Sequence, residues 1–234
     1  MTLPGAVRVV LLDIEGTTTP IAFVHERLFA YVRTHLQTYV ASHWNDQPVQ
    51  GAIRQLNEEC AAEGRSAITD PDTLLPVVRE LMDQDRKSPG LKTLQGLIWE
   101  DGYQAGELRG EVWEDVPVAM RRWRSEGREI AIYSSGSEMA QRRLFESTAA
   151  GDLTPLITAF FDTRVGAKVQ AGSYTKIAQA LGHPASSIVF VSDVTAELLA
   201  ARAAGLEVVL SVRPGNAPQP DAHLFPAVSA LTGI

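Results

Sequence analysis

The chain has 234 residues, a formal net charge of −7 and 45% hydrophobic residues. This length allows one full-sized core and a second, smaller unit, and the composition is that of a globular protein. Lys and Arg are not clustered, which argues against a nucleic-acid partner and against an anionic membrane surface. The single cysteine, Cys60, excludes a disulfide framework within the chain. The start of the chain lacks a signal-peptide pattern, and no run reaches the ~20 apolar residues of a membrane span, so we expect a cytoplasmic protein.

The first predicted strand, Val7–Ile14, is followed by a long interval without strand-like runs that extends to about Trp113. Apolar residues recur there at helical spacing. The pairs Asp70–Pro71 and Ser88–Pro89 are typical of an N-cap followed by a first-turn proline. Four helices are therefore expected, beginning near residues 24, 49, 71 and 89. We predict an all-helical cap domain, residues 20–113, inserted into a core domain made of residues 1–19 and 114–234.

Strands and helices alternate after the insert. The four further runs of aliphatic and β-branched residues are Glu129–Tyr133, Ala159–Phe161, Ser187–Val191 and Glu207–Val212. The helical patterns around them are Val118–Glu126, Glu138–Ser147, Ser173–Leu181 and Thr195–Ala204. Nearly continuous hydrophobic runs are typical of strands that are buried on both faces. The pattern therefore predicts an α/β fold, a doubly wound parallel sheet with helices on both faces.

Polar side chains follow the predicted strands at the points where the strands end. They are, in chain order, Asp13, Glu15, Ser134, Ser135, Lys168 and Asp193. Ligands of open α/β sheets bind beyond the carboxyl ends of the strands. We therefore expect these side chains to converge on one crevice.

This set of groups suits the hydrolysis of a phosphate monoester. A carboxylate can attack phosphorus and divide the reaction through an acyl phosphate, although a phosphate dianion repels it. Mg²⁺ held by acidic side chains offsets that repulsion, and a lysine ammonium adds positive charge. Serine hydroxyls and backbone N–H groups can bind the remaining oxygens, and a further carboxylic acid can protonate the leaving oxygen. The sequence therefore predicts a magnesium-dependent phosphatase that acts on a small phosphorylated metabolite.

The same residues also have structural interpretations. Ser134, Ser135 and Asp193 could each cap the helix that follows, because capping and phosphate binding use the same backbone geometry. Lys168 could be a solvated loop residue. The acids that end the first strand are harder to explain in this way, since buried acids are costly unless they are paired or bound to metal.

Longer blocks of the sequence carry a more specific pattern. Residues 12–21 read Leu-Asp-Ile-Glu-Gly-Thr-Thr-Thr-Pro-Ile, and the matching segments further on are Lys92–Gly96, Tyr133–Ser137, Gly166–Val169, Ser192–Thr195 and Val212–Ala217. These blocks, in this order, resemble the haloacid dehalogenase superfamily of phosphohydrolases, and within it the enolase-phosphatase family. Most members of the superfamily have Asp where this chain has Glu15. The likeness extends over nearly the whole chain, including the cap.

The resemblance implies a role for each candidate residue. Asp13 would be the nucleophile and a Mg²⁺ ligand. Glu15 would bind the metal through its backbone carbonyl and serve as the candidate general acid, and Asp193 would be the remaining acidic ligand. Ser134 and Ser135 would bind the phosphate or the dicarbonyl, and Lys168 would hold the phosphate.

The resemblance also implies the substrate and the assembly. The substrate would be 2,3-diketo-5-methylthiopentyl-1-phosphate, which is enolised and then dephosphorylated to 1,2-dihydroxy-3-keto-5-methylthiopentene in methionine salvage. We expect one Mg²⁺ per subunit and a monomer. Glu15 is one methylene longer than the usual Asp, so we hypothesise that its carboxylate takes the enolisation proton. Trp99 and Tyr103 are candidate cap contacts for the methylthio end, although each is also typical of a core.

Three other functions compete with this one. A general sugar-phosphate or phosphoglycolate phosphatase of the same superfamily is the main alternative, and Glu15 and the cap argue against it. A phospho-accepting signalling module would carry its acid pair before the phosphorylated Asp. An inactive binding protein would not need Asp13, Lys168 and Asp193 together.

Overall fold

The computed structural model describes residues 3, 5–84, 86 and 88–234. The chain divides into two compact units, Met1–Val24 with Arg109–Ile234, and His25–Leu108. The observed insert is shorter at both ends than the expected insert, which comprised residues 20–113. The reason at the second boundary is hydrogen bonding: Gly110 forms a β-bridge with Thr148, and the Trp113 N–H donates to the Thr18 carbonyl over 3.0 Å. These contacts attach residues 109–113 to the first unit.

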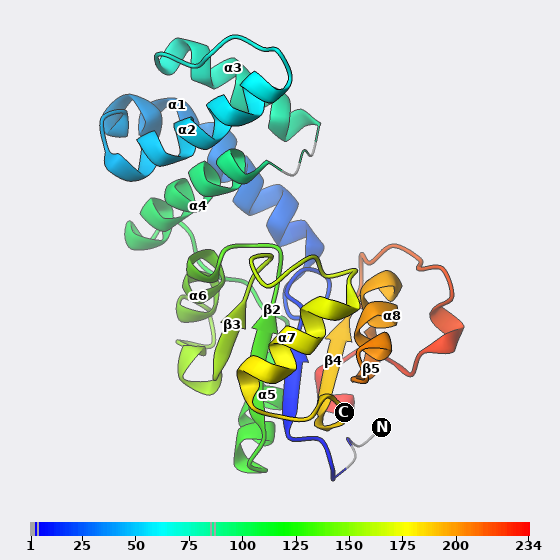
Figure 1. Ribbon diagram of the computed structural model, residues 1–234. Coiled ribbons are helices and arrows are strands. Elements are labelled where there is room, and N and C mark those ends of the chain that lie inside the picture. Colours follow the sequence, from blue (N-terminus) through cyan, green and yellow to red (C-terminus); the bar gives the residue numbers. More distant parts are fainter. Residues whose placement is uncertain (1–2, 4, 85, 87) are drawn as a thin grey trace. The chain divides into compact units, whose positions relative to one another are not determined.

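The first unit is built on a six-stranded parallel sheet (Figure 1). Its strands are β1 (Val9–Leu12), β2 (Glu129–Tyr133), β3 (Ala159–Phe161), β4 (Ile188–Ser192), β5 (Glu207–Ser211) and β6 (Ala227–Val228). Their order in the sheet is β3-β2-β1-β4-β5-β6. The central strand β1 is buried along its whole length, as the continuous hydrophobic pattern predicted.

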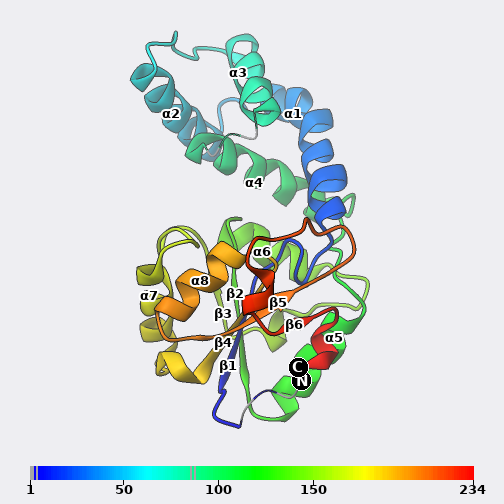
Figure 2. The same ribbon diagram turned by 90° about the vertical axis from the view of Figure 1, so that its right-hand side faces the viewer.

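Helices cover both faces of the sheet, so the predicted doubly wound α/β fold is confirmed. The four helices are α5 (Asp115–Ser125), α6 (Glu138–Glu146), α7 (Ala171–Leu181) and α8 (Thr195–Ala203). The chain moves outward from β1 to β3 and then returns across the sheet to β4 and β5. Right-handed crossovers therefore place α5 and α6 on one face and α7 and α8 on the other (Figure 2).

The C-terminal segment contains elements that the sequence did not predict. β6 has only two residues and pairs with Leu210 and Ser211 of β5. A two-residue strand is too short to produce a hydrophobic pattern.

Four single 3₁₀ turns were also not predicted, at Thr154–Leu156, Ala185–Ser187, Ala222–Leu224 and Leu231–Gly233. The loop expected at 213–220 is confirmed.

The second unit is all-helical over its described residues, as predicted. A π-helix (Phe23–Phe29) leads into α1 (Ala30–His43), which is followed by α2 (Gln47–Ala62), α3 (Pro71–Asp83) and α4 (Pro89–Gln104). The expected caps are present. The side chain of Asp70 accepts from the Thr73 N–H over 2.8 Å, and that of Ser88 accepts from the Leu91 N–H over 3.0 Å.

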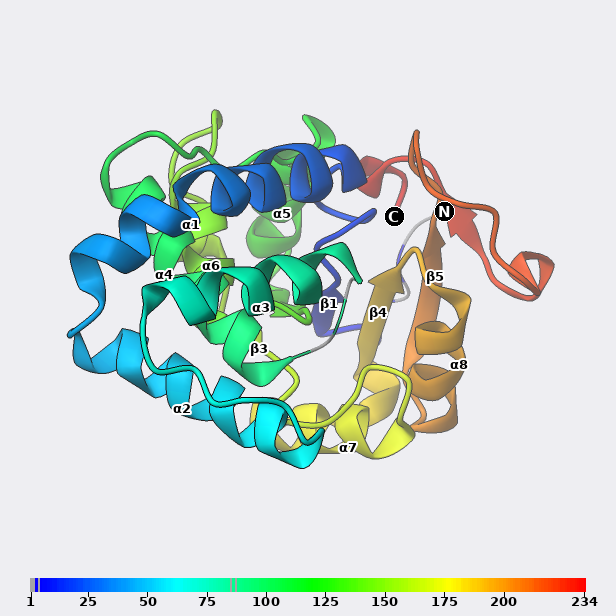
Figure 3. The ribbon, with the colours of Figure 1, turned by 90° about the horizontal axis from the view of Figure 1, so that it is seen from above.

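Figure 3 shows helices α1 to α4 of this unit from above. They pack around a leucine-rich core. Its fully buried side chains include Leu36, Leu56, Leu74 and Leu94, one from each helix. α2 and α4 approach closely at Gly90, where an added Cβ would lie 2.6 Å from Cγ of Leu56. No described helix of the protein is both long and apolar enough to cross a membrane.

Candidate active site

The sheet brings the ends of three strands to one edge. Leu12 of β1 pairs with Ile132 of β2 on one side and with Val191 of β4 on the other. Asp13 therefore leaves the sheet between the segment that carries Ser134 and the segment that carries Asp193. Strand register thus places five of the six predicted residues at a common edge, all except Lys168.

Lys168 and Asp13 form a buried ion pair at this edge. The Lys168 Nζ lies 2.6 Å from Asp13 Oδ1 and 2.7 Å from Glu197 Oε2. Lys168 is 8% exposed and Asp13 is 4% exposed, so neither is a solvated loop residue. Burial lowers the pKa of Lys168, but the carboxylates of Asp13 and Glu197 raise it further, and the net pKa lies above its ordinary value. The ammonium therefore stays charged.

The two oxygens of Asp13 have different surroundings. Oδ1 accepts from Lys168 Nζ and, over 2.7 Å, from the Ile14 N–H. Oδ2 has one long contact, 3.5 Å to Ser192 Oγ, whose shorter bond of 2.9 Å goes to Glu197 Oε2. One oxygen is thus fixed by strong donors, and the other is available to a metal or to phosphorus.

Asp193 does not cap the helix that follows it. The N-cap position of α8 is Val194, and no side chain caps this helix. Asp193 is 7% exposed, and burial, together with the negative charge of Asp13, raises its pKa from 3.8 to about 7. An added Cβ at Gly16, which has a φ of +70°, would lie 2.3 Å from Asp193 Oδ2. The absence of a side chain at Gly16 therefore makes room for this carboxylate.

The segment 134–137 follows β2 and contains three serines, one of which caps the next helix. Ser137 caps α6 and accepts from the Ala140 N–H over 3.3 Å. The Ser134 hydroxyl accepts from the Gly136 N–H over 3.2 Å, and Ser135 is exposed. Ser134 and Ser135 are therefore not needed as caps. They lie at the same edge of the sheet as Asp13, and the structure records no direct contact between them and Asp13.

Glu15 lies in the turn that follows Asp13. Its backbone forms a β-bridge with Thr19, and its side chain is half-buried. The bridge closes residues 15–19 into a tight turn, because the Gly16 N–H donates to the Thr19 carbonyl over 2.9 Å. Glu15 is thus held close to Asp13 in the chain, and its assigned roles stay predictions.

Sequence reasoning missed Glu197, Ser192 and Tyr174. Glu197 lies one helical turn after Asp193, so an i, i+4 comparison of acids could have found it. Burial and the charge of Asp13 raise the pKa of Glu197 above its ordinary value, although Lys168 and Ser192 oppose this shift. The Tyr174 hydroxyl donates to the Lys168 carbonyl over 2.6 Å and fixes the backbone of the lysine. No residue pattern indicates such a contact from helix to loop.

The donors at this edge fit a hard divalent cation. Asp13 and Asp193 supply buried carboxylate oxygens, the donor type that Mg²⁺ prefers. Among the described residues, no three His, Cys, Asp or Glu side chains are placed to hold a metal. The side chains alone therefore do not complete a site, and the predicted set completes it with a backbone carbonyl.

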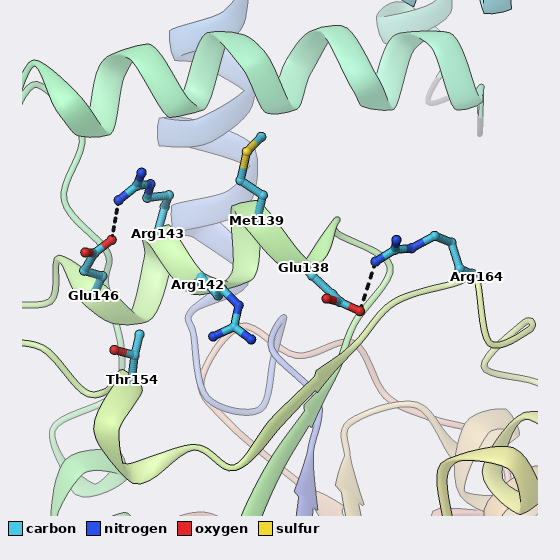
Figure 4. Close-up of a pocket in the computed structure, with 7 residues that line it drawn as sticks. All are labelled: Glu138, Met139, Arg142, Arg143, Glu146, Thr154 and Arg164. Atoms are coloured by element: carbon cyan, nitrogen blue, oxygen red, sulfur yellow. Dashed lines mark hydrogen bonds and ion pairs between the residues drawn. The ribbon is translucent and has the colours of Figure 1, made fainter. Parts of the chain in front are cut away.

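A separate pocket lies elsewhere on the first unit (Figure 4). It has a volume of about 600 Å³ and is lined by Glu138, Met139, Arg142, Arg143, Glu146, Thr154 and Arg164. Its guanidinium groups are already engaged: Arg143 with Glu146 at 2.6 Å, Arg164 with Glu138 at 2.9 Å, and Arg142 over the ring of Phe160 at 4.5 Å. None of the predicted site residues lines this pocket.

Comparison with known proteins identifies relatives over the whole chain. The sequence pattern of the haloacid dehalogenase-like hydrolases matches residues 7–205. Enolase-phosphatase E1 of Synechococcus elongatus is 46% identical over 222 residues, which cover 93% of each protein. Enolase-phosphatase E1 of Sorangium cellulosum is 48% identical over 210 residues and 90% of each protein. That of Drosophila virilis is 45% identical and covers 100% of this chain and 98% of the relative.

Comparison with solved structures identifies proteins with the same fold. The UTR4 protein of Saccharomyces cerevisiae matches with a TM-score of 0.79 and 34% identity, covering 96% of this chain and 98% of that one. CbbY of Rhodobacter sphaeroides, solved in complex with phosphate, matches with a TM-score of 0.56 at 15% identity, covering 96% and 95%. The second likeness shows the fold alone.

The raised pKa of Asp193 predicts a pH-dependent stability in EDTA. The unfolded chain loses this proton near pH 3.8 and the folded protein near pH 7. The contribution of Asp193 to the free energy of unfolding therefore decreases as the pH rises from 3.8 to about 7. Asp193→Asn should remove this part of the decline and be the more stable protein above pH 7, by up to about 4 kcal/mol. Urea unfolding of both proteins from pH 4 to pH 8 measures the difference. Parallel curves over this range would contradict the assignment.

Proposed function

We propose that this chain, which belongs to the enolase-phosphatase family of the haloacid dehalogenase-like hydrolases, catalyses two successive reactions of methionine salvage. It enolises 2,3-diketo-5-methylthiopentyl-1-phosphate and then hydrolyses the phosphate ester to give 1,2-dihydroxy-3-keto-5-methylthiopentene and inorganic phosphate. The observation that carries the proposal is the buried Asp13 carboxylate, which is paired with Lys168 at 2.6 Å at the end of the central strand. We also propose that the enzyme works as a monomer in the cytoplasm.

In the phosphatase step, Asp13 is the nucleophile. One carboxylate oxygen forms a bond to phosphorus while the bond between phosphorus and the ester oxygen breaks. Glu15 is the candidate acid that protonates the leaving oxygen, and it can then take a proton from the water that hydrolyses the acyl phosphate. Lys168 keeps its charge in the buried site and binds a phosphate oxygen, and Ser134 and Ser135 bind others.

One Mg²⁺ per subunit is the proposed cofactor. Asp13, the backbone carbonyl of Glu15 and Asp193 would hold it, in agreement with the oxygen-rich edge described above. When bound, the cation offsets the repulsion between the carboxylate and the phosphate and polarises the carbonyl groups of the substrate.

In the enolase step, a proton leaves the carbon that carries the phosphate ester, and the double bond forms toward the neighbouring carbonyl. A base must reach this carbon from the protein. Two features support Glu15 as this base: the residue is half-buried in the turn after Asp13, and its side chain is one methylene longer than that of Asp. The seryl hydroxyls at 134 and 135 are the candidates to orient the dicarbonyl.

A paired assay with Mg²⁺ tests the proposed function. Enol absorbance and phosphate release are followed together on the diketo phosphate, with glycolate phosphate and hexose phosphates as alternative substrates. Both signals should appear with the diketo phosphate, and Asp13→Asn should lower phosphate release by about 10⁴-fold or more, because the nucleophile is lost. Phosphate release from the generic substrates alone would leave a phosphatase and overturn the methionine-salvage assignment.

The role of Glu15 in enolisation is tested by Glu15→Asp. Shortening the side chain by one methylene should slow enol formation by about 10²-fold, since a displaced base transfers a proton poorly. Stopped-flow absorbance in a single turnover measures this step before phosphate leaves. Ser137→Ala, which removes only the cap of α6, is the control for general disturbance of the site. Full enolisation by Glu15→Asp would assign the base to another residue.

A further inference from the structure

The end of β5 and the loop that follows it hold the turn after Asp13 through three side chains. Ser211 Oγ and Asn216 Nδ2 donate to the Gly16 carbonyl over 3.2 Å and 2.9 Å. Arg213 Nε donates to the Thr17 carbonyl over 3.2 Å. This loop is thus a direct neighbour of the candidate active site, although none of its residues has been given a role there.

The orientation of the Asn216 amide is fixed by its partners. Nδ2 donates to two backbone carbonyls, that of Gly16 and, over 3.3 Å, that of Ser211. An amide oxygen in this place would face two acceptors, so the NH₂ group must occupy it. Oδ1 therefore points to the opposite side of the amide.

Asn216 Oδ1 is a buried acceptor without a donor among the described residues. An added Cβ at Gly16 would lie 3.1 Å from this oxygen and 2.3 Å from Asp193 Oδ2. The two oxygens therefore border the same small space beside Gly16. A buried acceptor without a hydrogen bond is unfavourable, and here it lies close to a carboxylate that cannot donate when it is ionised.

We propose that Asn216 is a positioning residue for the metal, and that its Oδ1 accepts a hydrogen bond from a water molecule on the divalent cation bound by Asp13 and Asp193. This inference rests on the proposed function, because it needs that cation. Mg²⁺ in proteins usually keeps several of its waters. Such a water is a strong donor, and it supplies the hydrogen bond that Oδ1 lacks. Gly16, without a side chain, leaves the space open.

The test is the affinity of the substrate-free protein for Mg²⁺, measured by isothermal titration calorimetry at pH 8. Asn216→Ala should weaken the affinity by about 10- to 100-fold, the usual effect of losing a partner of the inner ligands. The Mg²⁺-dependent rise in Tm should shrink in the same variant. Neither readout depends on catalysis.

Two further variants separate the oxygen of Asn216 from its NH₂ group. Ser211→Ala removes a second donor to the Gly16 carbonyl but leaves Oδ1 in place, so its Mg²⁺ affinity should stay within about threefold of wild type. Asn216→Asp keeps an acceptor and loses the two carbonyl contacts, and it should bind Mg²⁺ at least as tightly as wild type. Unfolding in EDTA confirms that each variant is folded.

Three results would overturn the inference. Equal losses in Ser211→Ala and Asn216→Ala would show that Asn216 acts only by holding the Gly16 carbonyl. Unchanged or tighter binding by Asn216→Ala would show that Oδ1 makes no contact with the hydrated cation. A wild-type protein that binds no Mg²⁺ would refute the proposed cofactor together with this inference, whereas the other two results leave the cofactor intact.

Discussion

The buried ammonium of Lys168 is the interaction on which the site depends. It lies between Asp13 and Glu197, and the Asp193 carboxylate is close enough to both for their charges to raise its pKa. One ammonium against three carboxylates leaves an excess of negative charge in a buried place. Buried acids are tolerated only when they are paired, protonated or bound to metal. The divalent cation proposed above would relieve the electrostatic cost of this site.

Two tyrosines, Tyr133 and Tyr174, position this ammonium. Lys168 Nζ lies 5.9 Å from the centre of the Tyr133 ring, and the Tyr133 hydroxyl donates to the Gly166 carbonyl over 3.0 Å. Tyr174 fixes the Lys168 carbonyl, and its ring meets that of Tyr133 edge to face at 5.5 Å. Both rings belong to the hydrophobic core under α7 and α8. Contacts with the core therefore fix the position of the lysine, although it lies in a loop.

Much of this arrangement could be predicted from the sequence, because strand ends in a parallel sheet meet at one edge. Asp13 and Asp193 follow the paired strands β1 and β4, and Lys168 follows β3, which joins the same sheet through β2. The contacts that could not be predicted depend on the direction of side chains. Glu197 and Asn216 reach the site from a helix and a loop, and neither belongs to a hydrophobic pattern. β6 was missed because a two-residue strand has no periodicity.

The central claim is that Asp13 becomes covalently phosphorylated during turnover. Acid quenching of the enzyme during turnover of the diketo phosphate, followed by borohydride reduction, tests it most directly. Reduction converts an acyl phosphate into an alcohol, so peptide mass spectrometry should find homoserine at position 13, and only when substrate was present. Phosphate release without this modification, or a reduced residue at another position, would contradict the account.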